Sequence, residues 1–286
     1  MKVFYRPEQV ATNASARSPS AFKPKQVVED WLACKLIQPE DIHSFEPVSR
    51  VVLKGAHNAE MVDDLLDLKI ANGFGNFDTE VAESLPYTSG SMLSAAKWAL
   101  VHRKAVCSPT SGFHHAGFRT PDGYCSFNGL MVTAVNLLQS GQVRSVAILD
   151  CDAHYGNGTD DIIDHLKLRD KVRHHTMGQH FEMQDSVGEN AVHFFAWLQA
   201  ALSDCIQTDL VIYQAGADAH IHDPLGGFLA SEEMRQRDMM VFAACKHVPL
   251  VWNLAGGYQR SASGGIEPVL ELHRITLRAC IECGAS

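Results

Sequence analysis

The sequence predicts an α/β protein in which a parallel sheet is covered by helices on both faces. Short apolar segments of strand length alternate with longer segments whose apolar residues recur every three or four positions. This alternation is typical of parallel strands joined by helices, because strands buried on both faces read as continuous apolar runs. The 286 residues contain no internal repeat and no linker-like tract. We therefore expect a single domain that spans residues 1–286.

The elements follow in order from the same two patterns. The segments expected to form strands are residues 105–107, 143–149, 210–213 and 249–254. The segments expected to form helices are one that begins at Val27, and residues 58–72, 91–101, 127–138, 190–203, 231–247 and 266–280. In the first helix, for example, Val27, Trp31 and Leu36 share one face. Residues 8–26, rich in Ala, Ser and Pro, are expected to be irregular.

Composition excludes several classes of protein. The chain is 46% apolar and 20% charged, and its net charge of −9 argues against direct nucleic-acid binding. No apolar run approaches the roughly 18 residues that a membrane span needs, and charge and proline interrupt the N-terminus before a signal-peptide core. The eight cysteines are scattered, and the CxxC spacing of Cys280 and Cys283 lacks a second pair. We expect a reduced, cytoplasmic protein with no membrane partner.

Polar residues gather where the expected strands end. The segments that follow the four strands are residues 111–117, 150–158, 214–223 and 255–258. In open α/β sheets, ligands bind outside the carboxyl ends of the strands. The common phosphate-binding glycine loops, the GxSxG nucleophile elbow and HExxH are all absent from the sequence. We therefore expect the His, Asp and Tyr residues of these segments to share one crevice. Its chemistry is expected to differ from that of the absent motifs.

Three of these residues suit a metal ion. In extended backbone, residues two apart point to the same side, so Asp152 and His154 can bind one ion. Asp218 follows a neighbouring strand and can complete the three protein ligands that a catalytic zinc usually takes. Two carboxylates with one imidazole also suit Fe²⁺ or Co²⁺. The alternative for Asp150-x-Asp152-x-His154 is a polar turn that caps a helix.

Three further residues suit proton transfer. His114 and His115 follow the first expected strand, where an imidazole could take a proton from water and return it to a leaving amine. Tyr258 follows two glycines, and its hydroxyl could donate to a developing oxyanion. Considered alone, adjacent histidines are usually surface or packing residues, and a buried tyrosine at a turn is usually a packing residue. The other twelve of the 15 histidines, His57 and His174 among them, are expected to have no direct role.

Together and in order, these motifs resemble the histone deacetylase superfamily, which includes histone deacetylases, acetylpolyamine amidohydrolases and acetoin-utilisation proteins. The matching segments are His114-His115-Ala116, Gly123-Tyr124-Cys125 with Phe127-Asn128, residues 150–159, Gly216-Ala217-Asp218 with residues 223–226, and Gly256-Gly257-Tyr258. The match is dense from about residue 101 to residue 260. It implies a sheet of the arginase-deacetylase type and hydrolysis of an acetyl-amide to an amine and acetate.

The resemblance also implies a role for each site residue. The residues that match the Zn²⁺ ligands are Asp152, His154 and Asp218. His115 matches the general base and acid, His114 the imidazole paired with Asp150, and Tyr258 the carbonyl-polarising hydroxyl. Asn157 stands where the family supports His115 with Asp or Asn, and since Asn carries no charge we expect His115 to be less basic here.

The remaining implications concern the substrate channel and a second ion. Gly123 and Tyr124 match the position of an aromatic channel wall, and Gly256 matches a residue beside the substrate. A structural K⁺ is usual in the family near the segment 150–154. The segment 172–190 at the pocket entrance is shorter than in most relatives, and Phe181 is the candidate for the second channel aromatic.

We therefore expect a metal-dependent deacetylase that acts on acetyl-lysine in proteins or peptides, or on a small acetylated amine. Acetylpolyamine hydrolysis is the alternative specific activity. A ureohydrolase on a related fold would need two metals and would leave the histidine pair and Tyr258 without a role. A non-catalytic acetyl-amine binding protein would be expected to have lost Tyr258 or a metal ligand, and this chain has them all.

Overall fold

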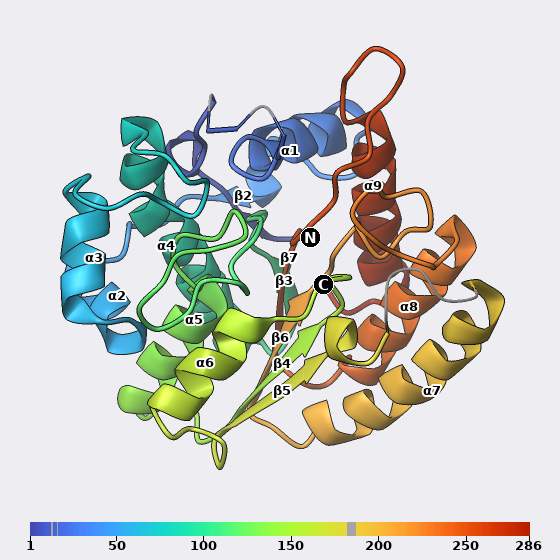
Figure 1. Ribbon diagram of the computed structural model, residues 1–286. Coiled ribbons are helices and arrows are strands. Elements are labelled where there is room, and N and C mark those ends of the chain that lie inside the picture. Colours follow the sequence, from blue (N-terminus) through green and yellow to red (C-terminus); the bar gives the residue numbers. More distant parts are fainter. Residues whose placement is uncertain (13, 16, 182–186) are drawn as a thin grey trace.

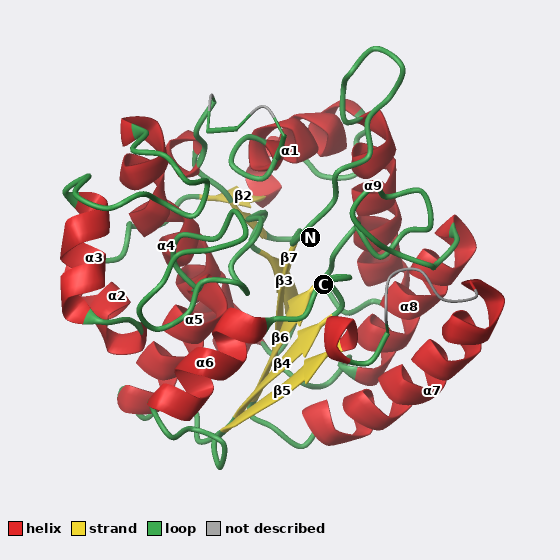
Figure 2. Cartoon of the chain, in the orientation of Figure 1, coloured by secondary structure: helices red, strands yellow, loops and turns green. Residues whose placement is uncertain are grey.

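A computed structural model describes residues 1–286 apart from 13, 16 and 182–186. In this part of the chain, seven strands form one sheet in the order β2-β1-β3-β7-β6-β4-β5, and every neighbouring pair is parallel. The strands are β1 (Val3–Phe4), β2 (Ile42–His43), β3 (Ala105–Cys107), β4 (Val146–Asp150), β5 (Val172–Thr176), β6 (Leu210–Gln214) and β7 (Leu250–Asn253). The sheet crosses the centre of the molecule with helices on both sides (Figure 2), which confirms the α/β prediction.

The helices divide into two layers (Figure 1). One face of the sheet is covered by α2 (Arg50–Ala56), α3 (Ala59–Leu66), α4 (Thr79–His102), α5 (Gly129–Gln139) and α6 (Asn157–His165). The other face is covered by α1 (Lys23–Ala33), α7 (Val187–Cys205), α8 (Ser231–Ala244) and α9 (Glu267–Glu282). Short 3₁₀ turns are η1 (Pro7–Gln9), η2 (Pro39–Asp41) and η3 (Met177–Gln179). No helix in the described part is both long enough and apolar enough to cross a membrane.

Each strand supplies both apolar cores because successive side chains point to opposite faces. In β4, Ala147 and Leu149 belong to the core beneath α7 and α8, whereas Val146 and Ile148 belong to the core beneath α5 and α6. All four side chains are fully buried. Full burial of an aliphatic side chain of Val, Leu or Ile size contributes roughly 1.5–3 kcal/mol, so these strands are anchored from both sides.

The structure also contains elements that the sequence patterns did not predict. These are β1, β2, β5, α2 and α6. α4 begins at Thr79, twelve residues before the predicted start, although Pro86 and Gly90 disfavour a helix interior. Gly90 is needed there because a Cβ would lie only 2.8 Å from the backbone oxygen of Glu46. The close approach of residues 46–48 thus explains a glycine that reads as a helix breaker.

The carboxyl edge of the sheet brings the predicted loops together. Asp150 at the end of β4 is in register with Gln214 at the end of β6, and Gln214 is in register with Asn253 at the end of β7. Thr176 at the end of β5 is the partner of Asp150 on the other side. The loops after these strands therefore leave the sheet side by side, as expected of a parallel sheet.

Candidate active site

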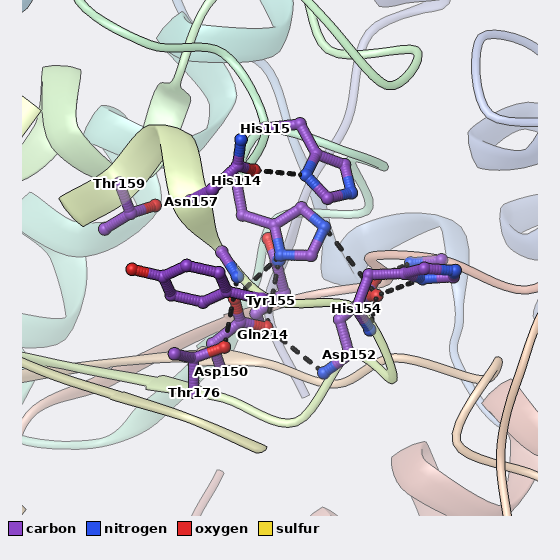
Figure 3. Close-up of polar contacts among 12 residues, drawn as sticks. His114, His115, Asp150, Asp152, His154, Tyr155, Asn157, Thr159, Thr176 and Gln214 are labelled. Carbon is purple, nitrogen blue, oxygen red and sulfur yellow. Dashed lines mark hydrogen bonds and ion pairs between the residues drawn. The ribbon is translucent and has the colours of Figure 1, made fainter. Parts of the chain in front are cut away.

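The structure brings together the three residues that the sequence predicts as metal ligands. Nδ1 of His154 lies 3.0 Å from Oδ1 of Asp152 and 3.1 Å from Oδ2 of Asp218. One potential ligand atom from each residue lies within 4.8 Å of the other two. Asp152 and His154 follow β4, and Asp218 follows β6, so the cluster depends on the pairing of these two strands. Asp152 and His154 appear in the centre and right of Figure 3.

Backbone amides orient the two carboxylates. Oδ2 of Asp152 accepts a hydrogen bond from the N–H of Gly256 at 2.8 Å, and Oδ1 of Asp218 accepts one from Ala153 at 3.3 Å. The other oxygen of each carboxylate is left facing His154. A Cβ on Gly256 would lie 2.2 Å from Oδ2 of Asp218, so only glycine fits beside both carboxylates.

The electrostatics of this cluster favour a cation. Burial raises the pKa of Asp218, and the neighbouring charge of Asp152 raises it further, to about 7. Burial lowers the pKa of His154, but the hydrogen bonds and charges of Asp152 and Asp218 outweigh this and raise it. Two buried carboxylates and one imidazole nitrogen that converge in this way are a donor set suited to a divalent ion. The residues present therefore fit the metal that the sequence predicts.

His114 and Asp150, which we call the inner pair, lie behind this cluster. Nδ1 of His114 donates to Oδ2 of Asp150 at 2.8 Å, and both residues are at most 2% exposed. Oδ1 of Asp150 accepts further hydrogen bonds from Gln214 and from the backbone of Asp152, each at 3.1 Å. Burial lowers the pKa of His114, but the charges of Asp150 and Asp152 raise it to about 9.

His115 and Asn157, which we call the outer pair, lie nearer the surface. Nδ1 of His115 donates to Oδ1 of Asn157 at 2.6 Å, and the rings of His115 and His114 are 4.1 Å apart (Figure 3). Burial and the charge of His114 lower the pKa of His115, although the bond to Asn157 opposes the shift. A groove of about 340 Å³ opens beside both residues and is also lined by Asp122. The outer pair is therefore accessible, in contrast to the inner pair.

His174 extends the inner pair, although the sequence pattern gave no reason to single it out. Its side chain is fully buried, with Nε2 3.9 Å from Oδ2 of Asp150 and Nδ1 3.3 Å from Oδ1 of Asp160. Burial lowers its pKa, but the two carboxylates raise it overall. His174 lies in the middle of β5, and the Asp150–Thr176 register places it beside β4. Only the pairing of β4 with β5, which the sequence did not predict, reveals this contact.

Tyr258 reaches the site from the loop after β7. Its backbone N–H donates to Oδ2 of Asp223 at 2.7 Å, so Asp223 holds the loop that carries the tyrosine. Burial raises the pKa of the Tyr258 hydroxyl, and the charges of Asp152 and Asp218 raise it further. The hydroxyl therefore stays protonated and can donate a hydrogen bond near the carboxylates.

The predicted channel residues also lie at this edge. The ring of Tyr124 is 6.3 Å from that of Tyr258. Gly123 has a φ of +52° and packs against His115, where a Cβ would be 2.4 Å from Cδ2 of the ring. Phe181 packs against Phe194 and Phe228, with ring centroids 5.9 and 5.5 Å away. The prediction for the entrance segment falls partly on residues 182–186, which lie outside the described residues.

Comparison with known proteins shows which proteins this chain resembles. Residues 19–180 match the model of the histone deacetylase domain. The chain is 29% identical over 232 residues to acetylpolyamine amidohydrolase 1 of Pseudomonas aeruginosa, covering 67% of this chain and 64% of that protein. It is 29% identical over 219 residues to histone deacetylase 2 of Arabidopsis thaliana, covering 69% of this chain and 56% of that protein. The chain thus spans less than two thirds of either relative.

A solved structure shows the same fold. The crystal structure of the HD domain of HDA15 superimposes with a TM-score of 0.76 over 100% of this chain and 88% of that one, at 20% sequence identity. The family match ends at residue 180, before Asp218 and Tyr258. The positions of these two residues therefore come from the structure, which places Asp218 with the candidate ligands Asp152 and His154, and Tyr258 beside Tyr124.

Proposed function

Because the chain belongs to the histone deacetylase family, we propose that it is a metal-dependent hydrolase that cleaves N-acetyl amides to a free amine and acetate. The observation that carries this proposal is the cluster of Asp152, His154 and Asp218, which lies at the same sheet edge as the inner and outer pairs. The proposed substrate is acetyl-lysine in a protein or peptide, or a small acetylated amine. We also propose that residues 1–286 form one deacetylase domain, and the eight free cysteines favour a cytoplasmic location.

Zn²⁺ is the metal that we propose for this cluster, and Fe²⁺ or Co²⁺ would suit the same donors. When bound, such an ion would polarise the acetyl carbonyl and make a water molecule more acidic. Asp152, His154 and Asp218 would hold it. A structural K⁺ is a second part of the proposal, and the adjacent buried oxygens of Asp150 and Thr176 are donors that it could use.

The chain's own groups then divide the proton transfers. His115 accepts a proton from the attacking water, because its Nδ1 is bound to a neutral amide and its ring adjoins the open groove. Tyr258 donates a hydrogen bond to the carbonyl oxygen as negative charge develops there. His114, held by Asp150, keeps a positive charge close by and favours return of a proton to the leaving amine.

The substrate's acyl-amine arm would lie against Gly123, Tyr124 and Gly256. A side chain at Gly123 would clash with the His115 ring and one at Gly256 with the two carboxylates, so the backbone itself forms these parts of the wall. Tyr124, near Tyr258, offers an aromatic wall to an aliphatic chain. Hydrolysis of acetylpolyamines is the alternative specific activity, because one of the relatives is named for that substrate.

Two more distant alternatives have less support. A ureohydrolase would need a second metal with additional carboxylates, whereas the described residues form one cluster of three potential ligands. A non-catalytic binding protein would have no use for the proton-handling inner and outer pairs, both of which are intact.

The direct test is acetate release by the purified protein from a panel of acetyl-lysine peptides and acetylpolyamines. The proposal predicts hydrolysis of at least one of the two classes, and the preferred class assigns the substrate. The matched control is Tyr258→Phe, which keeps the ring and removes the hydroxyl. It should lower kcat by roughly 10²-fold while leaving metal content unchanged. No acetate release from any substrate by the metal-loaded protein would contradict the proposal.

A further inference from the structure

Lys23 is a buried charge to which no role has yet been given. It is the first residue of α1 and is 0% exposed. Its Nζ donates to the backbone oxygen of Ala255 at 2.6 Å, across 232 positions of sequence. Burial of an ammonium group is costly unless it is compensated. The carboxylates whose charges act on it are Asp218 and Asp152 of the candidate metal site and Asp223, which holds the Tyr258 loop.

The acceptor of this hydrogen bond has an unusual backbone. Ala255 has a φ of +49°, in the left-handed region that residues other than glycine rarely adopt. Its carbonyl oxygen accepts a second hydrogen bond, from Oγ of Ser111, also at 2.6 Å. A strained residue persists only where its surroundings hold it. Here two side chains from distant parts of the chain hold the same oxygen.

The oxygen held by Lys23 belongs to a peptide unit that also reaches the proposed metal ligands. The Ala255 carbonyl and the Gly256 N–H are the two ends of one planar peptide group. The Gly256 end donates to Oδ2 of Asp152 at 2.8 Å. Two residues further on, the N–H of Tyr258 donates to Asp223 at 2.7 Å. The orientation of this one peptide therefore affects both Asp152 and the loop that carries Tyr258.

We propose that Lys23 is a positioning residue: it holds the carbonyl end of the Ala255–Gly256 peptide, and thereby fixes the amide end on Asp152 and the place of Tyr258. Its effect on turnover rests on the proposed function, whereas its effect on the loop does not. The ammonium charge is suited to this task because it also offsets the surrounding carboxylates. Ser111 is the neutral second donor to the same oxygen.

The loop can be tested by amide hydrogen exchange in Lys23→Met, which keeps the length of the side chain and removes its charge and donors. The amides of Gly256 and Tyr258 should exchange about tenfold faster or more, while amides in β4 and β6 keep their wild-type rates. Ser111→Ala should give a smaller increase at the same two amides. If Lys23→Met does not fold, the Ser111→Ala measurement decides. Wild-type exchange at both amides in the variants that fold would overturn the proposal.

Kinetics then separate positioning from general stability. Lys23→Met should lower kcat about tenfold with little change in KM, and the same substitution should have almost no further effect in a Tyr258→Phe background. An equal loss of kcat in both backgrounds would show that Lys23 does not act through Tyr258. That result would overturn the proposed effect of Lys23 on the position of Tyr258. If the wild-type protein hydrolyses no acetyl amide, the proposed function fails, and the exchange rates still test the positioning of the loop.

Discussion

Two histidines that are buried to the same degree, His57 and His114, lie in regions with opposite electrostatics. His57 is 1% exposed and packs at the start of α5, where its Nδ1 donates to the oxygen of Gly117 and its Nε2 accepts from the amide of Asn128. Burial lowers its pKa to about 4. His114 is 2% exposed at the carboxyl edge of the sheet, where burial lowers its pKa but Asp150 and Asp152 raise it to about 9.

The difference shows what the active-site edge adds to an ordinary core. Burial by itself favours the neutral imidazole, as at His57, where both ring nitrogens are satisfied by uncharged backbone groups. At His114 the nearby carboxylates more than reverse that effect. His115 of the outer pair combines features of these two histidines. It lies at the same sheet edge as His114, but it is partly exposed and, like His57, it is bound to an uncharged group. The charge of the hydrogen-bonding partner, more than the depth of burial, therefore determines the direction in which the pKa of a buried histidine shifts.

The largest expected effect concerns the stability of the His57 region. A pKa lowered from 6.5 to about 4 in the folded state means that the unfolded chain binds a proton first as the pH falls. The contribution of His57 is therefore complete above pH 6.5 and is lost as the pH falls toward 4, by up to about 3 kcal/mol. Urea unfolding between pH 7 and pH 4 should show a shallower loss for His57→Gln than for the wild type.

The control for this measurement is His102→Gln, which removes an exposed histidine from the chain in the same way. The loss of unfolding free energy between pH 7 and pH 4 should be shallower in His57→Gln than in this control. If His57→Gln followed the wild-type dependence, His57 would not be the neutral, fully satisfied group described above.

Asp150 is the charged partner of His114, so removing its charge tests the comparison with His57 most directly. Asp150→Asn keeps the shape of the side chain and an acceptor for His114 but removes the charge. We expect kcat to fall by roughly 10²-fold because the inner pair no longer stabilises an imidazolium. Metal content by mass spectrometry should stay stoichiometric. The matched control is Asp164→Asn, an exposed carboxylate on α6 paired with Arg169, which should not alter kcat. Wild-type turnover in Asp150→Asn would remove Asp150 from the proposed machinery.

A smaller effect is expected when the outer pair is made to resemble the inner one. Asn157→Asp places a carboxylate 2.6 Å from Nδ1 of His115 in the present geometry. The added charge should raise the pKa of His115 and move the acid limb of the kcat/KM profile to higher pH by about one unit. On the plateau, kcat should change by less than about tenfold. An unmoved acid limb would mean that His115 is not the base that the profile reports.

The sequence predicted the elements that carry a strong periodic pattern and missed those that lack one. β3 is found at its predicted residues because Ala105, Val106 and Cys107 are buried on both faces. β1 and β2 have two residues each, too few to show alternation. β5 includes Arg173 and His175, whose side chains are partly exposed because β5 is an edge strand, and the buried His174, which lies between two carboxylates. Short length and edge position thus account for the strands that were missed.

The candidate site was predictable where its residues follow strands, and hidden where they do not. The cluster of candidate ligands could be inferred because Asp152 and Asp218 each stand within five residues of the end of an apolar run. Lys23 stands at the start of a helix and reaches its partner 232 positions away, so no local pattern reveals it. The roles of Asp223 and of Asp160 likewise depend on contacts with distant loops and strands.

Metal-dependent hydrolysis is most directly tested by acetate release from protein stripped with a chelator, before and after one equivalent of Zn²⁺ is added. We predict no release by the stripped protein and full recovery at one equivalent, because Asp152, His154 and Asp218 form one three-ligand cluster in the described part of the chain. An Asp218→Asn variant should not recover at that concentration. Release by the stripped protein at the wild-type rate would contradict the metal-dependent mechanism.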